Sequence, residues 1–214
     1  MGIRACIFDL DGVIVDTAKY HYLAWKEIAE KLNIPFTEND NERLKGVSRM
    51  DSLEIILELG GVYLSEDEKE KYASEKNEQY RNYILKMTPD ELLPGVEDFL
   101  NELKRLNIAT AIGSSSKNAI TILEKIDLMR YFDVVMDGTK VTRAKPHPEL
   151  YLLCARSLKI PPSDCVVFED AVAGIEAAHF AGMKCVGVGS SSVLSEADMV
   201  IPGFTNLKAG NLLF

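Results

Sequence analysis

Short apolar runs alternate with stretches of helical periodicity along the second half of the chain, and this pattern limits the fold more than any other feature. Apolar runs bounded by polar or turn-forming residues predict strands at residues 108–112, 134–136, 165–168, 185–188 and 199–201. Helical spacing between these runs predicts helices at residues 96–106, 117–126, 149–158 and 172–181. Strands that alternate with helices favour a parallel sheet covered by helices on both faces.

The chain opens with one more apolar run, residues 5–8, which stops at Asp9 and Asp11 and is followed by Gly12. Such a run is typical of a buried parallel strand, and open sheets of this class bind ligands beyond the carboxyl ends of their strands. Residues i and i+2 of an extended chain lie on one side, so both acids can face one site if the strand geometry persists as far as Asp11. Two carboxylates this close must share a cation, share a proton or point apart. A hard cation such as Mg²⁺ suits them.

The acid pair is also compatible with purely structural roles. An Asp-Gly pair is a common hairpin turn, and acids at a strand end often cap a helix. A calcium loop is excluded, because Ile14 and Tyr20 stand where its glycine and its bidentate glutamate belong.

Residues 17–87 differ from the rest of the chain, because they are charged and helical in pattern with no convincing strand. Apolar residues recur at helical spacing across residues 23–32, and a second such pattern ends at Gly60. Ser65 and Glu68 form a capping box that opens a third helix.

We predict two domains on this basis. Residues 1–16 and 88–214 would form an α/β core, and residues 17–87 a smaller helical cap, inserted after the first strand and lying over the site. Trp25 falls on the apolar stripe of the first helical pattern, so its spacing predicts packing in the core of the cap rather than ligand binding.

Composition narrows the class of protein. The chain has 214 residues, of which 47% are hydrophobic, enough for one large domain or one domain with an insert. The net charge of −9 argues against unspecific binding to nucleic acid or to an anionic membrane. We see neither a signal peptide nor an apolar run long enough to span a bilayer. Reduced, buried thiols of a cytoplasmic protein are expected for the widely spaced Cys6, Cys154, Cys165 and Cys185.

Three further predicted strands also end in polar residues. Ser114, Ser115 and Ser116 precede a helix start at Lys117-Asn118, where hydroxyls, backbone amides and the helix dipole favour an anion site. The same residues are also compatible with an ordinary serine N-cap of the following helix, without an anion site.

Lys145 follows the third predicted strand and precedes Pro146 and Pro148, which stiffen its loop, although alone it could be a solvated lysine. Glu169 and Asp170 end the next strand and could simply cap the following helix. Together with Asp9 and Asp11, these two acids are expected to form an oxygen-rich cage, with Lys145 as the compensating charge.

The order of these motifs resembles the haloacid dehalogenase superfamily over the whole chain. Its four motifs are matched, in order, by Asp9 with Asp11, by Ser114, by Lys145 with Pro146 and by Glu169 with Asp170. The resemblance implies a Rossmann-like parallel-sheet core, an inserted helical cap domain and an Mg²⁺-dependent enzyme that transfers phosphoryl groups.

Within the superfamily, the chain is most similar to the phosphosugar mutases. The similarity rests on Asp16, Thr17, His21, Trp25, residues 44–49, Lys76, Asn77 and residues 114–118. Residues 45–49 discriminate best, because simple phosphatases of the superfamily share the core motifs but not this run. The resemblance implies interconversion of β-glucose 1-phosphate and glucose 6-phosphate through an aspartyl-phosphate and β-glucose 1,6-bisphosphate.

The resemblance also implies roles for the acids. Asp9 would be the nucleophile, and Asp11 the general acid and base. Mg²⁺ would be held by Asp9, by Glu169 or Asp170, and by the backbone carbonyl of Asp11, so all four acids are predicted metal-site residues.

Both domains would bind the substrate. Lys145 and Ser114 would cradle the transferring phosphoryl group, and Arg49 would hold the second phosphate opposite residues 116–118. Contact with the sugar, or coupling of cap closure to Asp11, would come from His21, Lys45 and Lys76. The predicted phosphate- and substrate-binding residues are Thr17, His21, Trp25, Lys45, Gly46, Arg49, Lys76, Ser114, Ser115, Ser116, Lys117, Asn118 and Lys145.

Two other functions compete with the mutase. One is an Mg²⁺-dependent sugar-phosphate phosphatase of the same superfamily, in which water is the acceptor. The other is a non-catalytic sugar-phosphate binder. A dehalogenase is disfavoured, because it needs neither Asp11 nor a metal. The expected partner is a small phosphosugar, without nucleic acid or membrane, bound by a monomer in the cytoplasm.

Overall fold

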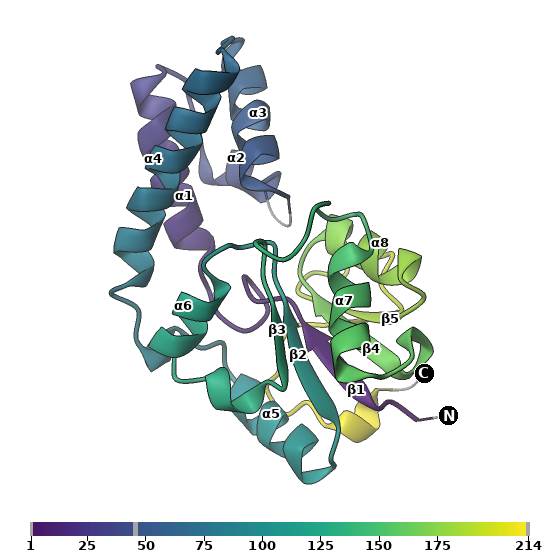
Figure 1. The fold of residues 1–214 in the computed structure, drawn as a ribbon. Helices are drawn as coiled ribbons and strands as arrows, with labels where there is room; N and C mark the ends of the chain where they lie inside the picture. Colours follow the sequence, from purple (N-terminus) through teal and green to yellow (C-terminus); the bar gives the residue numbers. More distant parts are fainter. Residues whose placement is uncertain (1, 45–46, 213–214) are drawn as a thin grey trace.

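A computed structural model describes residues 2–44 and 47–212 and contains one six-stranded sheet (Figure 1). The strands are β1 (Ala5–Phe8), β2 (Ala109–Gly113), β3 (Val134–Met136), β4 (Cys165–Glu169), β5 (Lys184–Val188) and β6 (Met199–Ile201). Their order across the sheet is β3-β2-β1-β4-β5-β6, and every neighbouring pair is parallel. This confirms the predicted α/β class, and β1 lies between β2 and β4 at the centre.

Eight α-helices accompany the sheet in the part of the chain that the structure describes. They are α1 (Ala18–Lys31), α2 (Glu38–Glu42), α3 (Arg49–Gly60), α4 (Glu66–Ile84), α5 (Val96–Arg105), α6 (Ala119–Lys125), α7 (Glu149–Leu158) and α8 (Val172–Phe180). Short 3₁₀ turns are η1 (Pro89–Glu91), η2 (Met129–Tyr131), η3 (Pro162–Asp164) and η4 (Ala209–Asn211). No helix in the described segments is both long and apolar enough to cross a membrane.

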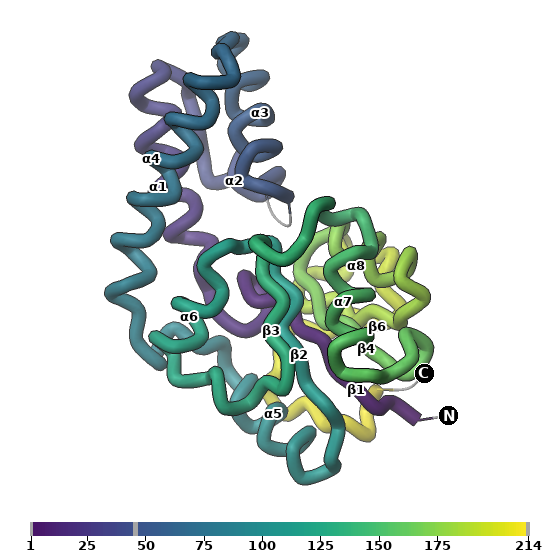
Figure 2. The backbone as a smooth tube through the Cα atoms, viewed as in Figure 1, coloured from purple at the N-terminus to yellow at the C-terminus, as the bar shows by residue number. Residues whose placement is uncertain are grey.

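Side-chain alternation along β1 explains why helices cover both faces of the sheet. Cys6 and Phe8 join the hydrophobic cluster that includes residues of α5 and α6, whereas Ala5 and Ile7 join the cluster under α7 and α8. All four side chains are fully buried, as expected for a central parallel strand. Figure 2 shows α5 and α6 on one side of the strands and α7 and α8 on the other.

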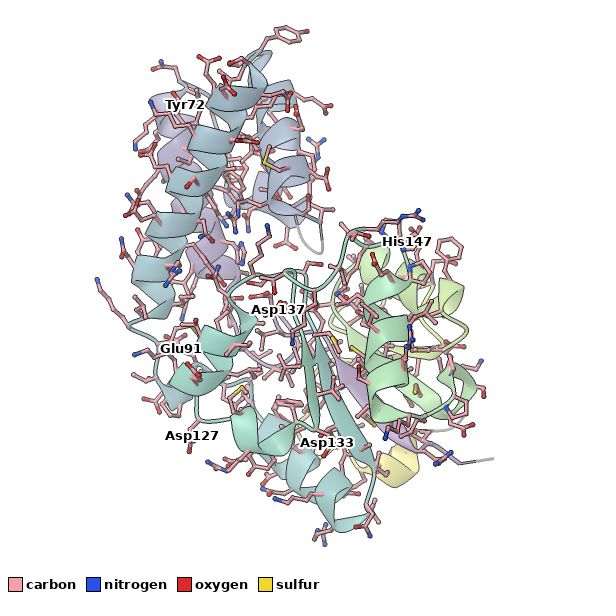
Figure 3. The ribbon with its side chains drawn as sticks, in the orientation of Figure 1. Tyr72, Glu91, Asp127, Asp133, Asp137 and His147 are labelled. Carbon is pink, nitrogen blue, oxygen red and sulfur yellow. The ribbon has the colours of Figure 1, made fainter. Side chains whose placement is uncertain are left out.

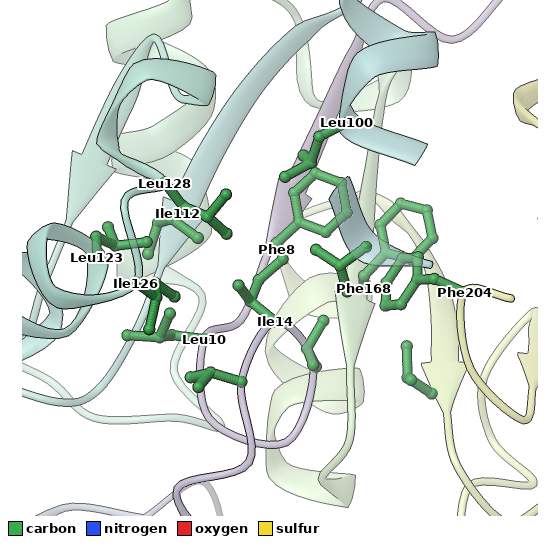
Figure 4. Packing of buried hydrophobic residues seen from close by; sticks show 14 of the residues in the cluster. Phe8, Leu10, Ile14, Leu100, Ile112, Leu123, Ile126, Leu128, Phe168 and Phe204 are labelled. Carbon is green, nitrogen blue, oxygen red and sulfur yellow. The ribbon is translucent and has the colours of Figure 1, made fainter. Parts of the chain in front are cut away.

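Aromatic packing fills the α5 side of the sheet (Figure 4). Phe8 and Phe168 are register partners on β1 and β4, and their rings stack with centroids 4.7 Å apart. Phe99 and Phe204 pack against this pair, with centroids 5.5 to 6.3 Å away. Burial of each phenylalanine stabilises the folded state by about 1.5–3 kcal/mol. The cluster therefore fixes the positions of β1 and β4, which lead into the acids.

Helices α1 to α4 form a separate bundle beyond the carboxyl ends of the strands (Figure 1). Its own hydrophobic core includes Trp25, Ile28, Leu53, Ile56 and Ala73, and Trp25 is only 1% exposed, as its spacing predicts. The predicted Ser65–Glu68 capping box is present at the start of α4, and α3 ends at Gly61 with φ of +61°.

Helix α2 was not predicted, although its signal is in the sequence. Thr37 and Asp40 form a capping box, but the helix has only five residues and too few apolar positions for a periodic pattern. Helix α6 begins at Ala119 rather than at the predicted residue 117, because the preceding residues form a turn. The remaining boundaries agree within about two residues, except that α1 and α3 begin earlier than their apolar patterns.

Candidate active site

A cavity of about 600 Å³ lies between the carboxyl ends of the strands and the helical bundle. The sheet side contributes Asp9, Asp11 and Asp170, and the bundle contributes Trp25, Arg49 and Lys76. Figure 3 shows the side chains around this region, with Asp137 following β3 at the edge that faces the bundle. Polar and charged groups from two parts of the chain thus converge on one concave space, as in most enzyme sites.

Lys145 is the buried cation at the floor of this site. Its Nζ donates to Asp9 Oδ1 at 2.5 Å and also to Glu169 Oε1, and its side chain is fully inaccessible to solvent. Burial alone would lower the pKa of Lys145, but the charges of Asp9 and Glu169 outweigh it and raise that pKa. Lys145 is therefore a permanent positive charge beside the Asp9 carboxylate.

Glu169 is held by donors on both carboxylate oxygens. Oε1 accepts from Tyr151 Oη at 2.7 Å as well as from Lys145, and Oε2 accepts from the backbone N–H of Ala171 at 2.9 Å. A Cβ on Gly174 would lie 1.9 Å from Oε1, so only glycine on α8 leaves room for this carboxylate. In this arrangement Glu169 fixes Lys145, with its own hydrogen-bonding capacity already used.

Asp170 approaches the loop that follows β1. A Cβ on Gly12 would lie 2.1 Å from Asp170 Oδ2, and Gly12 has φ of +80°, so only glycine is compatible with this approach. The Asp170 carboxylate therefore lies against the backbone of Gly12, and its charge acts on the Asp9 carboxylate. No group of three or more His, Cys, Asp or Glu side chains in a metal-holding arrangement is found among residues 2–44 and 47–212.

The charge balance around Asp9 fits a divalent cation. Burial raises the pKa of Asp9 well above its usual value, Lys145 lowers it, and the carboxylates of Glu169, Asp11 and Asp170 raise it again. Negative charge is in excess at this point despite Lys145. Mg²⁺ needs only one or two carboxylates because it keeps several waters, so Asp9 and Asp170 with a backbone carbonyl are a sufficient set.

Asp11 does not share a direction with Asp9. Strand β1 ends at Phe8, the chain turns at Gly12, and extended alternation does not reach the second acid. Its Oδ1 accepts from the hydroxyl of Thr17, lies 3.5 Å from Tyr80 Oη and is 3.8 Å from His21 Nε2. The strand geometry thus does not persist to Asp11, whose Oδ1 is directed toward Thr17 and the bundle, although both acids line the same cavity.

A row of polar groups leads from Asp11 into the bundle. His21 Nδ1 is 3.0 Å from Lys76 Nζ, and the ammonium lies over the rings of Trp25 and Tyr80 at 4.9 and 4.7 Å. Burial lowers the pKa of His21, and the nearby charge of Lys76 lowers it further, so the imidazole is neutral near pH 7. Burial raises the pKa of Asp11, but His21, Thr17 and Lys76 outweigh it and leave that pKa lowered.

Lys76 gives the fold a dependence on pH. Burial, together with the charge of Arg49, lowers its pKa to about 7, against about 10.4 for an exposed lysine. Between these two values the unfolded chain binds more protons than the folded chain, so stability rises with pH across this window. We expect Lys76→Met to remove this rise of roughly 1 kcal/mol per pH unit. Urea unfolding of both proteins at several pH values measures it, and parallel curves would contradict the prediction.

The segment between β2 and α6 is ordered by its own hydroxyls. Ser114 Oγ accepts from the N–H of Ser116 at 3.1 Å, and Ser116 Oγ accepts from the N–H of Asn118 at 3.2 Å. The Asn118 amide does not cap α6 but donates to Asn77 Oδ1 on α4 at 3.0 Å. Ser115, Ser116, Lys117 and Asn118 line the cavity, whereas Ser114 is fully buried behind them.

Arg49 and the segment around it come from the bundle side. Arg49 begins α3, lines the cavity and is half-buried, and burial lowers its pKa. The predicted substrate residues Lys45 and Gly46 lie outside the described residues. Trp25 lines the cavity and also belongs to the hydrophobic core of the bundle. Its position is therefore compatible with packing in the core and with contact to a ligand.

The chain passes twice between sheet and bundle, and Glu91 joins the two passages. Its carboxylate accepts from Lys19 Nζ at 2.5 Å and from Tyr20 Oη at 2.6 Å, both at the start of α1. Burial raises the pKa of Glu91, but these two donors outweigh it and lower that pKa. Figure 3 shows Glu91 at the foot of α4, where the chain returns to the sheet.

Tyr80, Tyr151 and Glu91 were not singled out in the sequence, and Asn77 was named there only among the residues that carry the similarity. Tyr80 lies four residues after Lys76 on α4, so the helical period could have indicated it. Tyr151 has the spacing of an ordinary core residue of α7, and Glu91 follows a proline in a loop. No local pattern distinguishes these two, because their partners come from distant segments.

Comparison with known proteins shows which family the chain resembles. The family model for haloacid dehalogenase-like hydrolases matches residues 3–182. A β-phosphoglucomutase from Bacillus subtilis is 46% identical over 201 residues, which cover 93% of this chain and 89% of the relative. A phosphorylated carbohydrates phosphatase from Thermotoga maritima is 35% identical over 184 residues, covering 85% and 83%.

The crystal structure of a β-phosphoglucomutase from Clostridium difficile superimposes with a TM-score of 0.94 at 44% identity, covering 98% of this chain and 95% of that one. The resemblance of the chain to mutases of this kind is thus confirmed. By the extent of the family match and the identity of its relatives, the chain belongs to the haloacid dehalogenase-like hydrolases.

Proposed function

We propose that this protein is a β-phosphoglucomutase, which interconverts β-glucose 1-phosphate and glucose 6-phosphate. The observation that carries the proposal is the buried Asp9–Lys145 pair at the floor of a cavity whose opposite wall presents Arg49. Phosphoryl transfer needs a nucleophile and matched positive charge at one end, and a mutase needs a second phosphate site at the other. The identity to mutases from B. subtilis and C. difficile supports this choice.

Asp9 is the nucleophile in this proposal. Phospho-Asp9 donates its phosphoryl group to O6 of β-glucose 1-phosphate, which gives the 1,6-bisphosphate and frees the Asp9 carboxylate. The bisphosphate turns over in the cavity, and Asp9 then takes the phosphoryl group from O1, leaving glucose 6-phosphate. Lys145 Nζ already contacts Asp9 Oδ1. It neutralises the negative charge on the oxygens of the phosphoryl group during the transfer.

Mg²⁺ is the divalent cation that we propose for the site. Asp9, Asp170 and the backbone carbonyl of Asp11 would hold it, and the close approach of Asp170 to Gly12 supports this set. The ion supplies screening between the anionic nucleophile and the anionic phosphate, which at ~4 Å repel by roughly 4 kcal/mol at intermediate dielectric. We propose that Glu169, whose oxygens accept from Lys145, Tyr151 and Ala171, orients Lys145 instead.

Asp11 is the proposed general acid and base. It must protonate the leaving sugar oxygen and deprotonate the attacking hydroxyl, so it must turn from Thr17 toward the cavity during each step. In the described arrangement the pKa of Asp11 is lowered, which favours its base form. Movement away from His21 and Lys76 would remove two causes of this lowering and favour the acid form.

Movement of a cap over the cavity would exclude water from phospho-Asp9. We propose that residues 17–87 are this cap, that residues 1–16 and 88–214 are the core, and that the passages near Asp16-Thr17 and residues 87–89 are the hinges. The contacts of Glu91 with Lys19 and Tyr20 tie the two passages together, so they can bend as one unit.

We also propose that the enzyme acts as a monomer in the cytoplasm. One chain supplies both walls of the cavity. All four cysteines are free and buried, as predicted, which suits a reducing compartment.

Arg49 is expected to separate mutase from simple phosphatase chemistry. We propose that it holds the phosphate that does not react, facing residues 116–118. Arg49→Ala should lower mutase turnover by roughly 10²-fold. The reason is that each half-reaction loses a charge-assisted contact that stabilises its transition state by about 1.5–3 kcal/mol. Hydrolysis of acetyl phosphate should change less than threefold, because this small acyl phosphate has no second phosphate. Equal losses in the two assays would contradict the assignment.

One assay tests the function as a whole. β- and α-glucose 1-phosphate are incubated separately with Mg²⁺ and a trace of glucose 1,6-bisphosphate, and glucose 6-phosphate and inorganic phosphate are both measured. The mutase predicts glucose 6-phosphate from the β anomer only. The alternative is a sugar-phosphate phosphatase, which the 35% identity to the T. maritima enzyme supports. It predicts inorganic phosphate as the sole product.

A further inference from the structure

Tyr151 is a buried phenol that contacts both Glu169 and Lys145. It lies on α7, is fully buried, and its Oη donates to Glu169 Oε1 at 2.7 Å. Lys145 Nζ donates to the same oxygen and lies over the Tyr151 ring, 5.1 Å from its centre. One side chain thus contacts the carboxylate through its hydroxyl and the ammonium through its aromatic face.

Two glycines make room for this arrangement. A Cβ on Gly113, the last residue of β2, would lie 3.0 Å from a ring carbon of Tyr151. A Cβ on Gly174, on α8, would clash with Glu169 Oε1. β2 and α8 therefore both pack directly against these two side chains, which leaves little room for either of them to move.

Packing alone does not require the hydroxyl. The ring of Tyr151 belongs to the hydrophobic cluster under α7 and α8, where phenylalanine would bury nearly the same apolar area. A buried hydroxyl lowers stability unless it is hydrogen-bonded, and Glu169 is its partner here. Tyr151 itself does not line the cavity, so any part that it has in the reaction must pass through the side chains that it holds.

We propose that Tyr151 is a positioning residue for phosphoryl transfer. Its hydroxyl fixes the Glu169 carboxylate, and Glu169 in turn holds Lys145 Nζ against Asp9 Oδ1. The inference rests on the proposed function, in which Lys145 neutralises charge on the transferring phosphoryl group. Such stabilisation depends on where the ammonium is held before the reaction, so loss of the hydroxyl should slow the transfer itself more than it weakens sugar binding.

Tyr151→Phe is the sharpest test, because it removes one oxygen and keeps the ring and its packing beside Lys145. We expect kcat for β-glucose 1-phosphate to fall roughly tenfold, the lower end of the effect found when a residue behind a metal site is replaced. KM should change by less than about threefold, because the proposed contacts with the sugar and the second phosphate remain. Phosphorylation of Asp9 by acetyl phosphate, followed in a single turnover by intact-protein mass spectrometry, should slow by the same factor as kcat.

Two further measurements test whether the hydroxyl acts through Lys145. Calorimetry should give Mg²⁺ affinities within about threefold for Tyr151→Phe and wild type, against roughly 10- to 100-fold for the loss of a partner that supports a metal ligand. The reason is that the hydroxyl donates to Glu169, which the proposed function leaves out of the metal site. In the background of Lys145→Met, adding Tyr151→Phe should slow the phosphorylation by less than about threefold, since no ammonium is left to position.

Tyr131→Phe is the matched control. The Tyr131 hydroxyl also donates to a carboxylate, Glu97 Oε1 at 2.9 Å, but Tyr131 lies on η2 and does not line the cavity. Its kcat and its phosphorylation rate should stay at the wild-type values. Both variants should fold, because each keeps its aromatic ring, and circular dichroism checks this.

Unchanged kcat and phosphorylation rate in Tyr151→Phe would overturn the inference. So would a loss confined to the mutase reaction, a Mg²⁺ affinity weakened as if a metal ligand had lost its support, or the full effect of Tyr151→Phe in the Lys145→Met background. Failure of the proposed function looks different. A wild-type protein that releases only inorganic phosphate from sugar phosphates would overturn the mutase, and slower phosphorylation of Asp9 in Tyr151→Phe would still support the role of Tyr151.

Discussion

Replacing Asp9 with asparagine is expected to lower mutase turnover by on the order of 10⁴- to 10⁶-fold, because the amide cannot form the phosphoenzyme. Asparagine has nearly the same shape, and Lys145 keeps its contact with Glu169. Burial already raises the pKa of Asp9 and so disfavours its charged form. We therefore expect Asp9→Asn to fold normally, with a Tm at or above the wild-type value.

The measurement is a pair of assays on the same protein. Coupled detection of glucose 6-phosphate follows turnover, and intact-protein mass spectrometry after treatment with acetyl phosphate detects the added phosphoryl group. Asp127→Asn is the matched control, since Asp127 follows α6 and is not among the residues that line the cavity (Figure 3). A phosphorylated Asp9→Asn protein, or one with measurable turnover, would show that another group is the nucleophile.

Replacing Lys145 with methionine is expected to damage both stability and activity. The change leaves Asp9 and Glu169 buried without their shared cation. Breaking a buried ion pair by removing one partner costs about 3–5 kcal/mol of folding free energy. Loss of a fixed positive charge at the transferring phosphoryl group should lower turnover by roughly 10³-fold.

Urea unfolding near neutral pH measures the loss of folding free energy. Turnover at saturating Mg²⁺ and substrate measures the loss of activity. Lys140 lies on the same connection between β3 and α7 but is exposed, with its Nζ donating to the carbonyl oxygen of Val135. Lys140→Met should therefore cost less than about 1 kcal/mol and leave turnover unchanged. If the two methionine variants behave alike, Lys145 has neither of the roles given to it here.

The fold was predictable from the sequence because its signals are local. The strand at residues 5–8 is a bounded apolar run, and the capping box of Ser65 and Glu68 is complete within four residues. The rules for parallel sheets then place the carboxyl ends of β1, β3 and β4 at one edge. Convergence of Asp9, Lys145 and Glu169 follows from that topology.

The arrangement within the site was less predictable, because it depends on distant partners. The direction of Asp11 is set by a turn at Gly12 and by Thr17 and Tyr80, which a strand pattern does not include. The contact of Asn77 with Asn118 joins two helices that are separate in sequence. Even residues whose roles were expected, such as His21, acquired their partners only in three dimensions.

The position of β1 has a consequence for synthesis of the chain. It is made first, yet its two neighbours in the sheet begin at Ala109 and Cys165. A nascent chain therefore carries β1 without any partner strand until β2 has left the ribosome, and with one open edge until β4 has done so. The contacts within residues 18–84 are closer in sequence and can form early. Ribosome-bound intermediates of this protein should combine a folded helical bundle with an exposed apolar segment at the amino terminus, to which chaperones can bind.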